Sequence, residues 1–189
     1  MAVLIVVSAF ATRGRAQETI VVLDPEKTTV TFTLDATLHT VHGTFRLKSG
    51  TIGFNPSTGT ASGMVVVDAT SGQTGNQRRD RNMHRDVLQS YRYPEITFRP
   101  TRVKGKVLPG TDSQAQVEGV LTLLGADHSI TLQCQLRGQA NDLHATTQLV
   151  IPYVAWGLKN PSNVLLHVAD KVDLSIAAVG RLTTAPPQN

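Results

Sequence analysis

The sequence has one cysteine, few aromatic residues and no catalytic signature. Its single thiol, Cys134, excludes an internal disulfide, and only 5% of the 189 residues are Phe, Trp or Tyr. In ITLQCQL, Cys134 shares the phase of Ile130 and Leu132, so we expect a small buried hydrophobe and not a nucleophile. The motifs GxSxG and HExxH, a glycine-rich phosphate loop and an acidic pair with catalytic spacing are all absent. We therefore expect a protein that is not an enzyme and holds no cofactor.

No apolar run suits a transmembrane helix. The most apolar stretch, AVLIVVSAFA at residues 2–11, has about half the length that spanning a bilayer requires. Its place before TRGRAQ is typical of a secretory signal, although no positive charge precedes it. We therefore predict a signal segment at residues 1–16, truncated at its start, and a periplasmic or secreted protein. A frayed cytoplasmic N-terminus is the alternative.

The excess positive charge is confined to one segment. Residues 76–102 hold seven arginines against Asp80, Asp86 and Glu95, and this difference equals the net charge of +4 for the whole chain. Such a local concentration does not suit a nucleic-acid-binding surface, so no nucleic-acid partner is expected. A solvated, salt-bridged helix face explains the arginines, and a site for an anion or an acidic partner is the alternative.

From residue 28 onward, apolar and polar side chains alternate. TTVTFTL places Val30, Phe32 and Leu34 on one face and threonines on the other, which indicates a half-buried strand. A second strand, GTFRLKSG, is expected to end at Gly50, and turn residues in TIGFNPSTG predict a hairpin into ASGMVVVDAT. Further alternating segments follow up to KVDLSIAAVGRL. Eight or nine strands at this spacing predict one all-β antiparallel sandwich or barrel.

One segment departs from the strand pattern. Thr74 and Gln77 stand at capping-box spacing, and Met83 begins an apolar stripe with a four-residue period. These features predict a short helical connector near residues 76–91, which Pro94 is expected to end.

An antiparallel sheet with one apolar face can close into a barrel, because closure removes both exposed edges. The strand phases give an inward set of Val30, Phe32, Leu34, Phe45, Leu47, Ile96, Phe98, Leu121, Leu123, Ile130, Leu132, Val172, Leu174 and Ile176. If this interior is not filled, its occupant must be apolar, since burying an unpaired polar group costs about 1 to 3 kcal/mol. A lipid chain fits that description. Alternation alone, however, favours an ordinary solid core.

Several segments in order resemble the YceI-like family of periplasmic lipid-binding proteins. The resemblance rests on GTFRLKSGTIGFNPSTGTASGMVVVDATSGQTGNQRRDRNMH, YPEITFRPTRV, VEGVLTLLG and ITLQCQL, and runs from about residue 23 to 182. It implies a single extended lipocalin-like antiparallel β-barrel of about eight strands over residues 17–182. A disordered tail at residues 183–189 is expected from its composition. The resemblance also implies an apolar pore that binds an amphiphilic lipid, a polyisoprenoid or an isoprenoid quinone, for transport, storage or sensing.

Strand phase and resemblance together give the candidate pore residues. They are Val30, Phe32, Leu34, Phe45, Met83, Leu88, Ile96, Phe98, Leu121, Leu123, Ile130, Leu132, Leu174 and Ile176. The resemblance implies that Met83 closes one end of the pore and that Arg79 and Asp80 form a structural charge pair. It also shows a departure, because Leu124 stands where members commonly have histidine.

Polar contacts to a lipid headgroup are expected from His39, His42 and Arg79. The two histidines also have a spacing that can converge on a metal, but no third ligand is close in sequence, so we expect no metal. A histidine-based metal enzyme and a solid-core interaction protein that docks an acidic partner through the arginine-rich insert are the other hypotheses. A monomer or a homodimer is expected.

Overall fold

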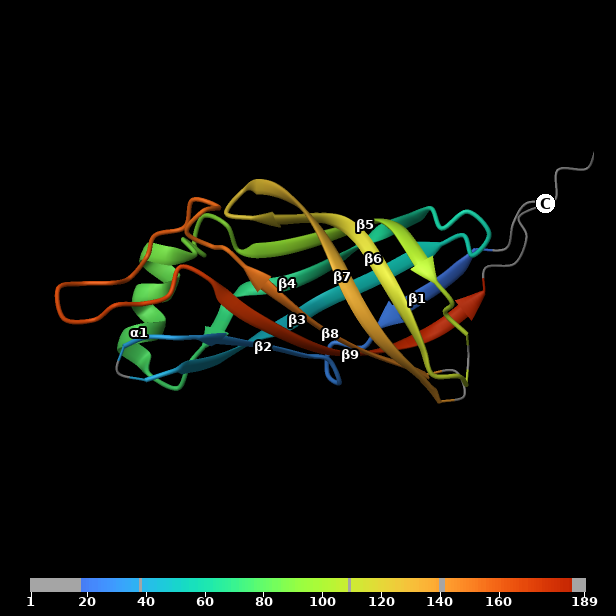
Figure 1. Ribbon diagram of the computed structural model, residues 1–189, viewed down its shortest axis with the longest axis horizontal. Helices are drawn as coiled ribbons and strands as arrows, with labels where there is room; N and C mark the ends of the chain where they lie inside the picture. The colour runs from blue at the N-terminus through green and yellow to red at the C-terminus, as the bar shows by residue number, and fades with distance from the viewer. Residues whose placement is uncertain (1–17, 38, 109, 140–141, 185–189) are drawn as a thin grey trace, which may run out of the picture.

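The chain forms one elongated barrel (Figure 1). The computed structural model describes residues 18–37, 39–108, 110–139 and 142–184. The predicted signal segment and residues 185–189 of the predicted tail lie outside these ranges, whereas residues 183 and 184 belong to the last strand and not to a tail. The strands are β1 (Thr19–Leu23), β2 (Thr29–Leu34), β3 (Val41–Phe54), β4 (Ala61–Gln73), β5 (Glu95–Gly105), β6 (Ser113–Leu123), β7 (Ala126–Gln139), β8 (Asp142–Ile151) and β9 (Val172–Thr184).

The sheet closes on itself as an antiparallel barrel of eight strand positions. Each strand from β4 to β9 pairs with the next, and the ring is completed by β3 with β4 and by β2 between β3 and β9. The five-residue strand β1 also pairs with β3 and β9, so β1 and β2 occupy one position of the wall in succession. The predicted closed barrel is confirmed, and the sandwich alternative is wrong.

A short turn separates β1 from β2. Pro25 follows β1 and has no N–H group with which to continue the ladder. The N–H of Thr28 donates to the carbonyl of Asp24 at 3.0 Å and closes the turn. The buried Thr28 hydroxyl then accepts from the N–H of Val179 on β9 at 3.2 Å, which replaces the missing ladder bond. The wall is therefore hydrogen bonded across the break.

Strand β3 is one continuous strand of 14 residues, so the expectation that it ends at Gly50 is wrong. Its pairing with β4 shifts register between Leu47 and Ser49. Before the shift, Val41 and Phe45 point inward, whereas after it Ile52 and Phe54 do so. An irregularity of this kind changes which residues of a strand face the interior.

One end of the barrel is covered by helix α1 (Gln77–Asn82) and the π-helical turn η1 (Met83–Val87). The side chain of Asn76 caps α1 by accepting from the N–H groups two and three residues further on, so the predicted capping role of Thr74 is wrong. The helix ends before Gln89, whose φ of 45° breaks the helical path, and not at Pro94. Among the described residues, no helix has the length and apolar character needed to span a bilayer.

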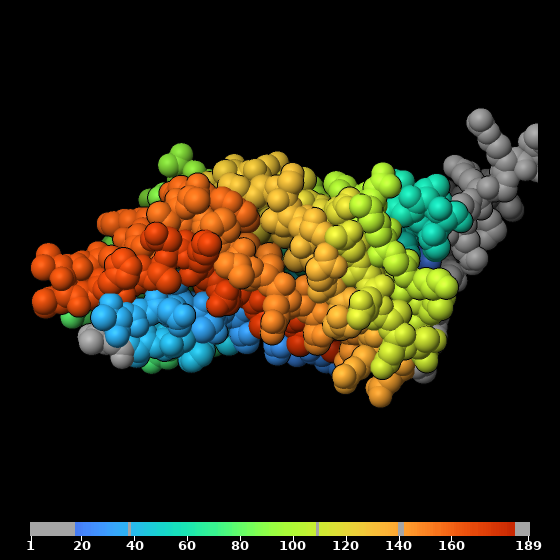
Figure 2. Space-filling view, in the orientation of Figure 1, coloured from blue at the N-terminus to red at the C-terminus, as the bar shows by residue number. Residues whose placement is uncertain are grey.

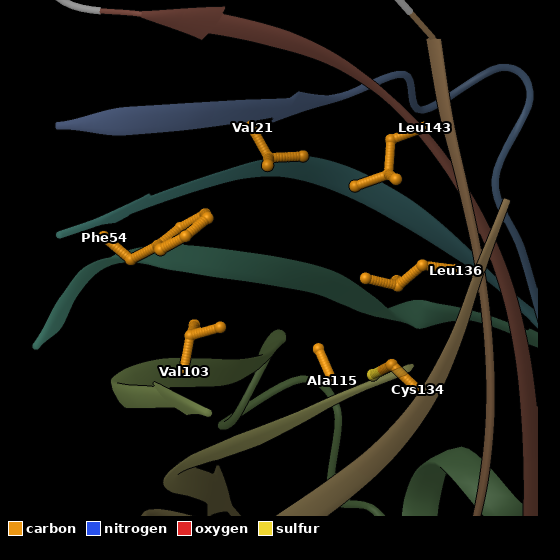
Figure 3. Packing of buried hydrophobic residues seen from close by; sticks show 7 residues of the cluster. All are labelled: Val21, Phe54, Val103, Ala115, Cys134, Leu136 and Leu143. Atoms are coloured by element: carbon orange, nitrogen blue, oxygen red, sulfur yellow. The ribbon is translucent and has the colours of Figure 1, made fainter. Parts of the chain in front are cut away.

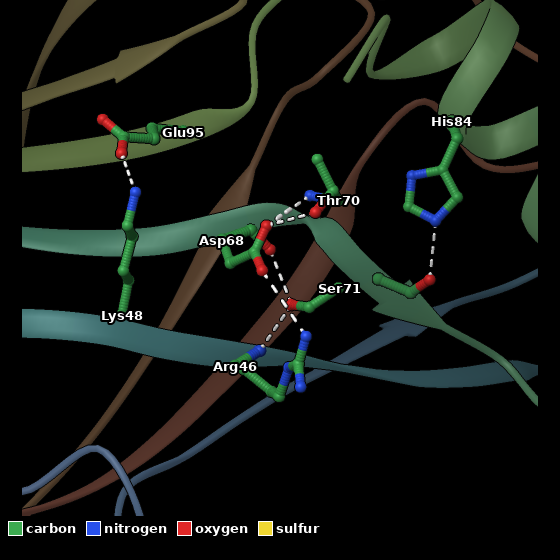
Figure 4. Close-up of polar contacts among 8 residues, drawn as sticks. Arg46, Lys48, Asp68, Thr70, Ser71, His84 and Glu95 are labelled. Atoms are coloured by element: carbon green, nitrogen blue, oxygen red, sulfur yellow. Dashed lines mark hydrogen bonds and ion pairs between the residues drawn. The ribbon is translucent and has the colours of Figure 1, made fainter. Parts of the chain in front are cut away.

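Polar contacts fix this helical segment and its neighbouring strands (Figure 4). The His84 Nε2 atom lies 2.8 Å from the Gly72 carbonyl on β4, and Nδ1 lies 3.0 Å from the Ser90 hydroxyl. Since a carbonyl only accepts, Nε2 carries the proton and Nδ1 accepts from Ser90. Exposed ion pairs join β3 to β4 through Arg46 and Asp68 at 3.6 Å and, across β4, join β3 to β5 through Lys48 and Glu95 at 2.6 Å. The His84 contacts hold the helical segment against β4, whereas the exposed ion pairs join strands only and contribute little.

Buried apolar side chains gather in two groups inside the barrel. The far cluster consists of Val21, Phe54, Val103, Ala115, Cys134, Leu136 and Leu143, whose side chains point into the barrel in Figure 3. The near cluster consists of Leu123, Ile151, Tyr153 and Leu158 and lies toward the helical end. As expected, Cys134 is buried with a free thiol.

Candidate functional site

A cavity of about 660 Å³ runs inside the barrel. Residues of both buried clusters line it, so it extends from the far end of the barrel to the helical end. Its volume lies within the range of roughly 300 to 1,000 Å³ that is typical of small-molecule sites. The interior is therefore hollow, and the solid core that alternation alone favours is wrong.

Alternation along the strands, which changes phase at the register shifts of β3 and β5, builds the lining. On β8, for example, Leu143, Ala145, Leu149 and Ile151 line the cavity, whereas the exposed Val150 points out. All fourteen candidate pore residues line the cavity: Val30, Phe32, Leu34, Phe45, Met83, Leu88, Ile96, Phe98, Leu121, Leu123, Ile130, Leu132, Leu174 and Ile176. Their contact with a ligand remains a prediction. Leu47 is buried in the same phase as Phe45 but is not part of the lining.

The cavity reaches solvent at the helical end, which we call the mouth. The lining residues that are also exposed come from the β2–β3 connection, from α1 with its N-cap and from the loop at residues 152–171. They are His39, Asn76, Arg78, Asn82, Pro161 and Asn163. Within the described part of the chain no Asp or Glu lines the cavity, so the mouth combines neutral polar groups with guanidinium groups. An apolar tube with a polar, cationic mouth matches the two parts of an amphiphile.

Thr74 fixes Arg79 at the mouth. The guanidinium Nε donates to the Thr74 hydroxyl at 2.7 Å, and a terminal nitrogen donates to the Thr74 carbonyl at 3.0 Å. The Asp80 carboxylate accepts from the N–H of Thr74 at 2.9 Å, so Arg79 and Asp80 are linked through Thr74 and not by a direct ion pair. The other terminal nitrogen lies 3.4 Å from His39 Nε2. Because a guanidinium only donates, His39 accepts there and carries its proton on Nδ1.

Of the three residues predicted to contact a headgroup, the structure brings only two to the mouth. His39 and Arg79 both line the mouth, but His42 is exposed on β3 and lies 3.2 Å from the Thr33 hydroxyl, away from the cavity. Across the described residues, no three His, Cys, Asp or Glu side chains converge as metal ligands would. Sequence reasoning missed Arg78, which lines the mouth beside Arg79 and has no acidic partner among the described residues. The sequence feature that could have identified Arg78 as a mouth residue is its place in the first turn of α1, next to Arg79.

Two weakly polar groups interrupt the apolar interior. The Thr147 hydroxyl and the Cys134 thiol both line the cavity, and the hydroxyl has no clear hydrogen-bond partner among the described residues. Burial raises the pKa of the Cys134 thiol, which keeps it neutral, and the weak contact with Thr147 opposes this. Away from the mouth, the lining therefore carries no charge and suits an apolar chain.

The loop at residues 152–171 completes the mouth, although its sequence shows no periodicity that predicts it. Near its start, the Tyr153 hydroxyl donates to the Ala169 carbonyl at 2.8 Å, and burial together with nearby Asp170 raises the pKa of Tyr153 to about 12. The Trp156 ring stacks on His128 with ring centres 3.9 Å apart. Further along, Pro161, Asn163, Leu166 and Val168 line the cavity. Sequence reasoning missed these four residues.

Comparison with known sequences finds relatives over most of the chain. A family model described as the YceI-like domain matches residues 22–179. Among curated proteins, Protein YceI of Escherichia coli O157:H7 is 32% identical over 104 residues, which cover 54% of this chain and 52% of that protein. Protein YceI of Salmonella arizonae is 30% identical over 106 residues, with the same coverage of 54% and 52%. These alignments thus span about half the length of the curated relatives.

Solved structures share the fold at low sequence identity. A polyisoprenoid-binding domain from Saccharophagus degradans, described as implicated in plant cell wall breakdown, superposes with a TM-score of 0.68 at 19% identity, covering 86% of this chain and 98% of that one. BcnA of Burkholderia cenocepacia gives a TM-score of 0.67 at 18% identity, with coverage of 83% and 98%. At these identities the likeness supports the barrel fold alone.

Proposed function

The chain belongs to the YceI-like family, and we propose that its barrel binds one amphiphilic lipid of the isoprenoid type, a polyisoprenoid or an isoprenoid quinone. The observation that carries this proposal is the cavity of about 660 Å³, apolar along the barrel and cationic at one mouth. The description of the Saccharophagus degradans relative as polyisoprenoid-binding supports the same ligand class.

Burial of the lipid tail provides most of the binding free energy. Each Å² of apolar surface removed from water contributes roughly 25 cal/mol, and the lining offers apolar side chains along the whole barrel. Part of this gain is offset by the cost of ordering the ligand, so affinity does not follow directly from area. A branched isoprenoid tail suits a lining of Val, Leu, Ile and Phe.

The mouth selects the headgroup. Arg79 is held by Thr74 and keeps further N–H groups available, and Arg78 adds a second guanidinium at the same place. Guanidinium groups donate hydrogen bonds and favour anionic or carbonyl oxygen acceptors. A phosphate or a quinone carbonyl therefore fits, and a cationic headgroup does not.

We infer non-catalytic binding in the periplasm or outside the cell, for transport, storage or sensing of the lipid. The cavity offers no acid and base pair, because no carboxylate lines it within the described residues and its one thiol is kept neutral. The hollow interior removes the basis for the alternative of a solid-core protein that docks an acidic partner.

Organic extraction and mass spectrometry of protein purified from its native compartment test the proposal. We expect a long-chain isoprenoid lipid to co-purify with the wild-type protein. Leu121→Arg should abolish its retention, because it places a charge in the apolar cavity. Arg92→Ala is the control, since this exposed side chain lies over the Tyr93 ring and does not line the cavity. Folding of each variant is verified by circular dichroism, and the absence of any lipid from folded wild-type protein would refute the proposal.

A further inference from the structure

Two adjacent apolar side chains stand fully in solvent at the mouth. Val164 and Leu165 have exposed fractions of 101% and 88% and form the tip of the 152–171 loop. The loop projects beyond the helix in Figure 1 and forms the extended end of the surface in Figure 2. Single exposed apolar residues are ordinary on protein surfaces, but a projecting pair beside a lipid-sized cavity is a candidate contact surface.

The tip is held in place by its own hydrogen bonds. The Asn163 side chain accepts from the N–H groups of Leu165 and Leu166 at 2.9 and 3.0 Å, and the Asn163 N–H donates to the Leu166 carbonyl at 2.9 Å. Thr37, in the β2–β3 connection, exchanges hydrogen bonds with His167. Asn163 and Leu166 line the cavity while the two residues between them face solvent, so the same turn forms part of the mouth and presents the tip.

Positive charge lies at the same end. Arg78 and Arg81 are exposed on α1 and have no acidic partner among the described residues. Asp86 pairs with Arg85 at 2.7 Å. Asp80, Asp35 and Asp170 accept hydrogen bonds from the neutral Thr74, Thr40 and Asn160 and keep their negative charge, but among the described residues none of them forms an ion pair with Arg78 or Arg81.

We propose that the Val164–Leu165 tip and the α1 arginines dock the mouth on an anionic lipid bilayer, so that a lipid enters or leaves the barrel directly from the membrane. Apolar side chains that enter the headgroup region gain from burial, and arginines near an anionic surface add electrostatic attraction. An acidic protein would satisfy the arginines but not the apolar tip. The transfer of a lipid between membrane and barrel rests on the proposed function. Binding of the protein to the membrane is measured on protein without bound lipid.

Flotation of delipidated protein with vesicles tests the docking. We expect wild-type protein to float with vesicles of phosphatidylcholine and phosphatidylglycerol and to float poorly with phosphatidylcholine alone. Arg78→Gln with Arg81→Gln should lower partitioning about 30-fold, and Val164→Glu with Leu165→Glu by at least about tenfold. Matched controls at the opposite end, Met64→Glu with Leu108→Glu and Arg137→Gln with Arg181→Gln, should float as wild type.

A tryptophan at the tip reports the contact directly. In Leu165→Trp the indole is exposed, so its emission should shift to the blue when anionic vesicles are added. An unshifted spectrum, or equal flotation of tip variants and controls, would overturn the proposal. A concentration-dependent dimer that forms without vesicles and is lost in Val164→Glu would instead assign the tip to a second copy of the chain. Lipid co-purification is scored separately, so its failure is distinct from failure of docking.

Discussion

Enlarging a small side chain inside the cavity distinguishes a hollow barrel from a solid one by the sign of the stability change. Ala178 lines the cavity on β9, next to the exposed Ala177. Ala178→Leu adds about three carbon atoms to the cavity, and each buried CH₂ is worth about 0.8 kcal/mol. We therefore expect the free energy of unfolding to rise by up to about 2 kcal/mol. In a solid core the same change would lower it by about 1 to 3 kcal/mol through overpacking.

Urea unfolding of delipidated protein gives the free energy, and delipidation matters because a bound ligand would itself stabilise the wild type. Ala177→Leu is the matched control, since it makes the same change one residue away on the outer face. Its effect should stay within about 0.5 kcal/mol. Lipid recovered from native protein should fall only in Ala178→Leu. A destabilised Ala178→Leu with undiminished lipid would refute the inward-lining argument.

Three further predictions concern the surroundings of the site. Hydrogen bonds from Thr70 are the main reason that the pKa of Asp68 lies below its usual 3.8, so ionised Asp68 stabilises the fold above that pH and loses this effect as the pH falls through the lower folded-state value. Asp68→Asn should therefore lower the urea midpoint at pH 7 and match wild type in strong acid. Asn76→Ala removes the α1 cap and should lower the free energy of unfolding by about 1 kcal/mol in urea titrations, with no change if the cap is dispensable. Thr74→Val releases the Arg79 guanidinium and should weaken retention of anionic lipids more than neutral ones by mass spectrometry, and equal retention of both would argue against headgroup selection.

Strand phase was a reliable guide to the cavity because a pleated strand leaves only two directions for its side chains. Val30, Phe32 and Leu34 show this on β2, where each lines the cavity as predicted. The hollowness itself could not be predicted from phase, since a solid core has the same alternation. Only the resemblance to the YceI-like family indicated a cavity before the structure did.

The misses have local physical causes. Strand β1 was not predicted, because TIVVL is a short apolar run without alternation and follows a polar segment. Ile52 and Phe54 are absent from the predicted inward set, because the register shift after Leu47 in β3 leaves no mark in the sequence. The mouth residues of the 152–171 loop depend on tertiary contacts such as that of Thr37 with His167, which no sequence period reveals.

Dividing one wall position between β1 and β2 has a consequence for how the barrel comes apart. The five residues of β1 fill the gap between β3 and β9 beside the far cluster, while β2 fills the same gap toward the mouth. Detaching β1 would break the hydrogen bonds that close the wall beside the far cluster and leave the wall at the mouth intact. Proteolysis or truncation that removes residues 19–23 would thus open a gap in the wall between β3 and β9 beside the far cluster, while β2 still joins these strands toward the mouth.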